Sequence, residues 1–221
     1  MFKKFLFGLL VLATVQTFSQ ETFVAAGSKS VLFSFSGLSD LGAGDFAGGA
    51  GVKYFLNSQS ALRVGLQLTQ ASTTTPANPP TGGVGADGSS SKFGFGLSAA
   101  LEYHLSAKRV SPYLGGGISF STSSDENKGL FSGPSGSPIV QTTTKNASGN
   151  TTFSIFGLFG AEYFIADAVS LAAEYQLGYG MTSAKDKEVS TPGYPTVTTK
   201  GESKGSISLN SAGTLTLAIY F

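Results

Sequence analysis

The chain has 221 residues, a length that suits one domain, with 14 basic and 13 acidic residues and a formal net charge of +1. Without a basic surplus it lacks the electrostatic footprint of a nucleic-acid-binding protein, and without cysteine it can form neither disulfides nor a reactive thiolate. Only 12% of the residues are charged, against about 25% in a typical soluble domain.

Residues 1–19 have the pattern of a cleavable secretory signal peptide. Two lysines precede an apolar run of 11 residues, and Thr17 and Ser19 are small residues at the −3 and −1 positions of a cut before Gln20. The apolar run is shorter than the ~20 residues of a spanning helix, which favours a signal peptide over an N-terminal membrane anchor. We therefore expect residues 20–221 to form the mature domain.

Eight segments of the mature chain alternate apolar and polar residues with a period of two, which predicts strands with two chemically different faces. They are residues 29–38, 46–56, 61–71, 92–104, 110–121, 152–164, 168–181 and 205–221. Each is long enough for a tilted membrane strand of ~9–11 residues. A chain this apolar, without a later helical span, is expected to satisfy its backbone in a closed barrel.

The connections between these segments alternate between short and long. Short turns fall at 57–60, 105–109 and 165–167, and longer polar connections at 39–45, 72–91, 122–151 and 182–204. Short periplasmic turns and long extracellular loops are typical of outer-membrane barrels, whereas a soluble sandwich has no reason to sort its loops this way. We therefore predict an all-β fold: an eight-stranded antiparallel up-and-down transmembrane β-barrel.

Two apolar clusters interrupt the long polar loops, Leu130-Phe131 and Ile139-Val140. Either they prolong the neighbouring strands or pack on each other, or they contact a partner at the cell surface. The first alternative involves only the fold of the chain and is the one we favour.

The strand phase also predicts an aromatic girdle at the periplasmic interface. Four aromatic residues end the strands that run toward the periplasm and face lipid in this phase: Tyr54, Tyr103, Tyr163 and Phe221. The residues that precede the three tyrosines consequently face the lumen, and all three of them are charged.

The inward-facing charged residues form a predicted lumen charge network. Its members are Lys53, Arg63, Glu102, Glu162 and Glu174. An eight-stranded barrel is just wide enough for side chains to fill, and an unpaired buried charge costs several kcal/mol, so these groups must pair. Lys53 and Arg63 balance Glu102 and Glu162, and Glu174 is left to pair elsewhere or take a proton. The network is either a structural plug, which we favour, or a switchable ion gate.

Several motifs carry a resemblance to a known family. The signal peptide, the Val110-Ser-Pro-Tyr-Leu-Gly-Gly-Gly strand, the Glu-Tyr strand ends and the terminal Tyr-Phe resemble the small outer-membrane β-barrel superfamily. That superfamily includes the OmpA transmembrane domain, the OmpX and OmpW types and porin-like outer-membrane barrels of the Bacteroidetes. The resemblance implies localisation in the bacterial outer membrane, contact with outer-membrane lipid, and recognition of the C-terminal strand by the barrel-assembly machinery.

The sequence predicts no enzyme, no cofactor and no metal site. It contains no Gly-x-Ser-x-Gly elbow, P-loop or metal-ligand cluster. Its one histidine, His104, lies by phase at the periplasmic mouth, a membrane height from the outer leaflet where some barrel enzymes act. We predict an outer-membrane barrel with a structural or surface-interaction role and a plugged lumen. The alternative is a narrow, porin-like passive channel for ions or small solutes.

Overall fold

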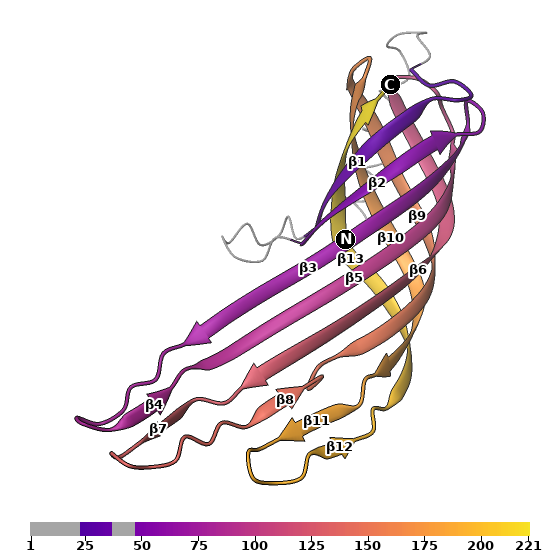
Figure 1. Ribbon diagram of the computed structural model, residues 1–221. Helices are drawn as coiled ribbons and strands as arrows, with labels where there is room; N and C mark the ends of the chain where they lie inside the picture. The colour runs from indigo at the N-terminus through magenta and orange to yellow at the C-terminus, as the bar shows by residue number, and fades with distance from the viewer. Residues whose placement is uncertain (1–22, 37–46) are drawn as a thin grey trace, which may run out of the picture.

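The computed structural model describes residues 23–36 and 47–221, and every regular element in these ranges is a β-strand (Figure 1). The eight long strands are β1 (Lys29–Ser36), β2 (Ala47–Phe55), β3 (Ser60–Thr75), β5 (Gly88–His104), β6 (Val110–Lys128), β9 (Asn150–Ala166), β10 (Val169–Ala184) and β13 (Ser203–Tyr220). The short strands are β4 (Val84–Ala86), β7 (Phe131–Gly133), β8 (Thr143–Lys145), β11 (Lys187–Ser190) and β12 (Val197–Thr199). The predicted signal peptide and the predicted loop 39–45 lie outside the described residues. Within the described ranges, no helix has the length and apolarity to cross a membrane.

The long strands pair antiparallel in chain order, and the last strand pairs with the first. The order is β1–β2–β3–β5–β6–β9–β10–β13, and β13 returns to β1 with a register from Ser30 opposite Tyr220 to Phe35 opposite Leu215. The backbone hydrogen bonds therefore close into a ring, which is how strands satisfy their backbone in lipid. The predicted all-β antiparallel fold is confirmed.

The strands run further than the sequence predicts at the end away from the short turns. β3 and β5 pair without interruption from Ser60 opposite Tyr103 to Thr75 opposite Gly88, so the predicted loop 72–91 is too long. The same holds for 122–151, because β6 continues to Lys128. These extensions are rich in serine and threonine, which resembles loop composition. Threonine is β-branched, however, and an adjacent strand allows it to extend the sheet.

The tips of the extensions carry the five short strands, at the lower end of Figure 1. β8 pairs with β6 and with β11, β11 pairs with β12, and β4 pairs with β7. Phe131 lies in β7 opposite Ala86, so it belongs to a small separate sheet and does not prolong β6. Leu130, Ile139 and Val140 have exposed side chains.

The two faces of the barrel wall differ as the alternation predicts. Along β5 the side chains of Phe93, Leu97 and Leu101 are exposed on the outer face, whereas Gly96, Ala100 and Glu102, in the opposite phase, are buried on the lumen side. The lumen is not uniformly polar, because Phe156 packs inside against a buried cluster of Ala100, Tyr113, Leu158 and Ala172. Gly117 makes room for that ring: a Cβ at Gly117 would lie 2.7 Å from Cζ of Phe156.

An apolar layer fills the lumen at the end of the short turns. This mouth cluster consists of Val24, Leu32, Phe55, Ala61, Phe164, Ala218 and Tyr220, with Phe23 and Ala107 packed against it. The segment before β1 contributes Val24, which is 2% exposed, and Phe23, whose ring stacks on Phe164 at a centroid distance of 4.9 Å. The Phe23 amide donates to the Ala107 carbonyl at 3.0 Å, which fixes this segment across the mouth. Sequence reasoning missed this layer.

Candidate functional site

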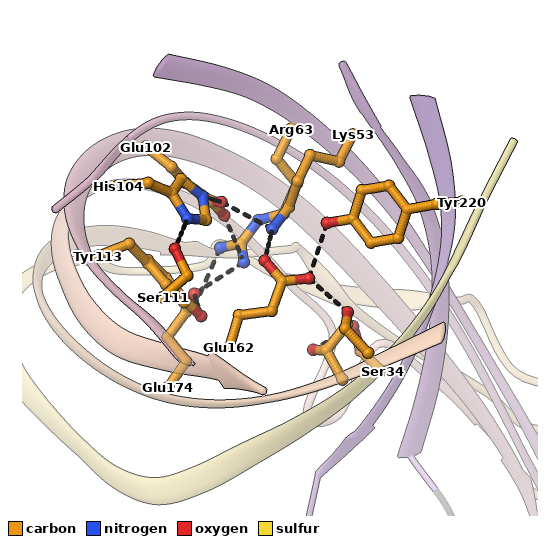
Figure 2. A network of polar contacts seen from close by, with 12 residues as sticks. Ser34, Lys53, Arg63, Glu102, His104, Ser111, Tyr113, Glu162, Glu174 and Tyr220 are labelled. Atoms are coloured by element: carbon orange, nitrogen blue, oxygen red, sulfur yellow. Dashed lines mark hydrogen bonds and ion pairs between the residues drawn. The ribbon is translucent and has the colours of Figure 1, made fainter. Parts of the chain in front are cut away.

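The five residues of the predicted lumen charge network lie together inside the barrel (Figure 2). Alternation along five different strands directs their side chains to the lumen, and Lys53 and Arg63 are direct cross-strand partners on β2 and β3. Glu102 on β5 and Glu162 on β9 are fully buried, and Lys53 is 3% exposed. The site is therefore a cluster of charges removed from water, which is stable only if every charge is paired.

Glu102 is the centre of the network, since it binds both cations. Its Oε2 atom lies 2.9 Å from Nζ of Lys53, and its Oε1 atom lies 2.9 Å from Nη1 of Arg63. Lys53 also contacts Oε2 of Glu162 at 3.2 Å. Removing Glu102 would leave two buried cations each with one partner fewer.

Glu174 completes the network through a two-point contact with Arg63. The Arg63 atoms Nη1 and Nη2 donate to the two carboxylate oxygens of Glu174 at 2.7 and 3.0 Å. Tyr113 and Gln176 donate to the same carboxylate at 3.1 and 2.6 Å. The sequence expectation left Glu174 outside the balanced group. In the structure the long Arg63 side chain spans from Glu102 to Glu174, giving a row of alternating charges: Glu162, Lys53, Glu102, Arg63, Glu174.

Hydroxyl donors complete the coordination of Glu162. The Tyr220 hydroxyl donates to Oε1 of Glu162 at 2.7 Å, and the Ser170 hydroxyl donates to the same oxygen. Sequence reasoning did not select Tyr113, Tyr220 or Ser170 as members of the site. Their inward strand phase was available as a signal, because each sits on the lumen face of its alternating strand.

His104 lies beside the network in a fully buried position. Its Nδ1 atom is 2.8 Å from Oγ of Ser111, and its Nε2 atom is 3.2 Å from Oε2 of Glu102. A serine, a histidine and an acid are thus in contact, but in a catalytic triad the serine faces Nε2 and the acid faces Nδ1. Here the order is reversed, Ser111 is 0% exposed, and its hydroxyl donates to the Ser106 carbonyl. The arrangement presents no nucleophile to a substrate.

Beyond the network, toward the tips of the extensions, the lumen holds a cavity of about 330 Å³. Arg63 and Glu174 line it together with serine, threonine, glutamine and glycine residues. A second cavity of about 240 Å³ shares Gln67, Gly96 and Ser121 with the first. Across the described part of the chain, no group of three or more histidine, cysteine, aspartate or glutamate residues could hold a metal ion.

Comparison with known protein families identifies the family to which this ring of strands belongs. A family profile for the outer membrane protein beta-barrel domain matches residues 5–198. The chain belongs to this family. The predicted superfamily and the bacterial outer-membrane localisation are thereby confirmed. No curated protein matches the sequence.

Solved structures of outer-membrane proteins are similar to this chain at low identity. They include OprG from Pseudomonas aeruginosa, 11% identical, with a TM-score of 0.47 over 91% of this chain and 99% of that one. The N-terminal β-barrel domain of OprF from the same organism is 13% identical, with a TM-score of 0.42 over 90% and 100% of the two chains. A major outer membrane protein from Thermus thermophilus is 14% identical, with a TM-score of 0.44 over 88% and 99%.

In this member of the outer-membrane barrel family, the predicted girdle residues all lie on the outside at the short-turn end. The exposed fractions of Tyr54, Tyr103, Tyr163 and Phe221 are 43%, 45%, 48% and 77%. The guanidinium of Arg109 lies 5.9 Å from the centre of the Tyr163 ring. The girdle and the charge network thus occupy the two faces of the same end of the barrel wall.

Proposed function

We propose that the protein is an integral outer-membrane barrel with a closed lumen, in which the eight long strands cross the membrane. In this proposal residues 1–19 direct secretion and are removed, and residues 20–221 form the barrel domain. The apolar outer face supports the proposal, since it runs from the girdle to Phe93 on β5 before serine replaces apolar residues at Ser91 and Ser89. Outer-membrane lipid would cover this band.

The observation that carries the closed lumen is the pair of stacked layers at its periplasmic end. The charge network joins side chains from five strands across the lumen by ion pairs, and the mouth cluster adds an apolar layer directly beside it. An ion crossing here would have to separate several buried pairs, and separating one such pair typically costs ~3–5 kcal/mol. It would then meet an apolar layer that offers it no ligand. The plug is favoured over the gate and over the narrow passive channel.

A structural or surface-interaction role, without enzymatic activity, fits the rest of the molecule. Ser111 and His104, which contact each other, are both fully buried. Arg63, which lines the cavity, forms ion pairs with Glu102 and Glu174. The tips of the extensions instead expose large side chains, among them Tyr194 and Val197. Surface contacts of the protein would be made there. The barrel-assembly machinery would recognise β13 with its final aromatic residue.

Planar bilayer recordings of the purified, refolded full barrel test the closed lumen. We expect no steady unitary conductance. Insertion of the same preparation into a membrane is verified separately, by its protection from protease in lipid vesicles. A variant lacking residues 23–28 and carrying Lys53→Ala and Glu102→Ala, which opens both layers, serves as the conducting control. Steady unitary currents from the unmodified protein would reject the plug and support the passive channel.

A further inference from the structure

The three carboxylates of the charge network face only hydrogen-bond donors. Glu162 accepts from Lys53, Ser170 and Tyr220, and Glu174 accepts from Arg63, Tyr113 and Gln176. Glu102 faces Lys53, Arg63 and His104. Each of the three carboxylates also has a side-chain nitrogen of Lys53 or Arg63 at 2.7–3.2 Å, and a cation this close stabilises the ionised form of a carboxyl group. All three groups are therefore ionised.

His104 is in the opposite situation, because both of its ring nitrogens face acceptors. The Ser111 hydroxyl uses its only proton toward the Ser106 carbonyl, so its oxygen must accept from Nδ1 of His104. On the other side, Nε2 faces the ionised carboxylate of Glu102 at 3.2 Å. A neutral imidazole carries one N–H and could satisfy only one of these contacts; an imidazolium satisfies both.

The charge count points the same way. The network holds three carboxylates but only two permanent cations, Lys53 and Arg63, which leaves a net charge of −1 in a largely buried site. A proton on His104 raises the positive charge to three and balances the three carboxylates. Because an unbalanced charge is unfavourable in a buried site, the balanced state is the stable one.

We propose that His104 binds a proton as an imidazolium and acts as the third cation of the lumen charge network, making the network electrically neutral. The proposal goes beyond the closed lumen and does not depend on the barrel being non-conducting, because it concerns which groups hold protons. It gives the site a ligand, the proton, and gives the one histidine of the chain a function.

The groups packed around His104 bury this proton while the lumen is closed. Lys53 and the Phe55 ring face it from β2, Glu102 from β5, Ser111 and Tyr113 from β6, and Glu162 lies across the lumen on β9. The Phe55 and Tyr113 ring centres are 5.0 and 5.1 Å from the imidazole. His104 is 0% exposed, so its proton can exchange with water only when the packing around the ring opens. Release of the proton and loosening of the plug are thus coupled.

Nitrogen NMR of the refolded, untagged full chain tests the proposal directly, since selective ¹⁵N-histidine labelling reports on His104 alone. At neutral pH in micelles we expect two protonated ring nitrogens with similar shifts. One protonated and one bare nitrogen, with widely separated shifts, would overturn the proposal. The bilayer recordings are independent of this result, so failure of the proton site and failure of the closed lumen can be told apart.

Glu102→Gln provides the matched perturbation. It removes one negative charge, so the remaining carboxylates balance Lys53 and Arg63, and His104 should lose its proton while the barrel stays heat-modifiable. Asp125→Asn is the control, because Asp125 is a buried carboxylate bound to Asn127 and Ser148 in the β6 extension, remote from the network. It should leave the imidazolium signature unchanged. Two protonated nitrogens persisting in folded Glu102→Gln would contradict the charge-balance argument.

A stability measurement adds a test that does not depend on NMR. His104→Gln leaves the network with a net charge of −1 and should lower the urea midpoint. Adding Glu102→Gln restores neutrality, so the double variant should unfold at a higher urea concentration than His104→Gln alone. Equal shifts from Glu102→Gln in both backgrounds would show that His104 carries no charge in the folded protein.

Discussion

The phenol of Tyr113 occupies the space that a side chain at Gly160 would need. The two residues are cross-strand partners on β6 and β9, and a Cβ at Gly160 would lie 2.8 Å from both Cζ and the hydroxyl oxygen of Tyr113. Because Gly160 has no side chain, Tyr113 can lie across β9 and donate to Glu174 on β10 at 3.1 Å. One glycine therefore sets the contact between the wall of the barrel and the charge network.

Replacing Gly160 by alanine should destabilise the barrel by ~1–3 kcal/mol, the usual range for overpacking. The added methyl group meets Tyr113 and also the Ala173 carbonyl oxygen at 2.5 Å, so either the ring or the strand must move. Urea unfolding in detergent micelles measures the loss. Gly157→Ala is the control, since its nearest contacts would be at 3.9 Å. Equal stabilities of the two variants would contradict the packing argument.

Glu102→Ala should cost ~3–5 kcal/mol of unfolding free energy, the range for breaking a buried ion pair, because Lys53 and Arg63 each lose a partner. The same urea assay measures it, with double variants combining Glu102→Ala with Lys53→Ala or Arg63→Ala. Glu126→Ala is the surface control: its ion pairs with Lys128 and Lys145 span 3.9 Å between exposed groups and should contribute ~0–1 kcal/mol. Strict additivity of the double variants would exclude a coupled network.

Val24→Ala should destabilise the folded barrel by about 2 kcal/mol, from ~0.8 kcal/mol per buried carbon and a further contribution from the cavity left behind. The residue is 2% exposed within the mouth cluster, whereas Val197 on β12 is 61% exposed and serves as the matched control. Hydrogen exchange of the mouth residues should also accelerate in Val24→Ala. No change in either measurement would mean that the segment before β1 does not hold the mouth closed.

Trypsin added to intact cells should cut after Lys200, which is exposed between β12 and β13, and should spare the exposed Lys108 in the turn between β5 and β6. The proposed topology places these residues on opposite sides of the outer membrane. Mass spectrometry of the released fragments identifies the cut sites. Permeabilised cells provide the control, because cleavage after Lys108 should then appear. Cleavage confined to Lys108 in intact cells would reverse the orientation.

Phe221→Lys should reduce the yield of heat-modifiable barrel in the outer membrane while secretion across the inner membrane continues. The side chain is 77% exposed, and the Phe221 amide donates to the Lys29 carbonyl at 3.0 Å. The variant therefore removes an exposed recognition element and keeps the closing hydrogen bond. Quantitative blotting of membrane and periplasmic fractions distinguishes the two steps. An unchanged membrane yield would rule out an assembly signal at this position.

The period of two was sufficient to predict most of the barrel wall. Alternation fixes which side chains share a face, so the inward positions of Lys53 and Glu102 and the outward positions of Tyr54 and Tyr103 follow from strand phase. Strand phase does not show how far a side chain extends across the lumen, however. The length of the Arg63 side chain links Glu102 to Glu174, and that contact depends on the height of each residue in the lumen.

Other features left no periodic signal in the sequence. Phe23 and Val24 precede the first alternating segment, and only the folded mouth brings them under Phe55 and Phe164. Tyr113 and Tyr220 are in the inward phase, but an uncharged phenol gives no sign in the sequence that it binds a carboxylate. The extended ends of β3 and β6 were missed because runs of serine and threonine form solvated loops and strands alike, and the neighbouring strand decides between the two.

The uninterrupted ladder between β3 and β5 has a mechanical consequence. Sixteen residue pairs join these strands from Ser60 to Thr75, and their register contains no shift between the girdle and the outer tip. At about 3.3 Å per residue, the stretch of β3 beyond Leu68 adds roughly 20 Å of hydrogen-bonded ribbon. The tip is consequently held as a stiff arm at a fixed angle to the barrel. A molecule bound at the tip would therefore be held in a fixed orientation relative to the barrel.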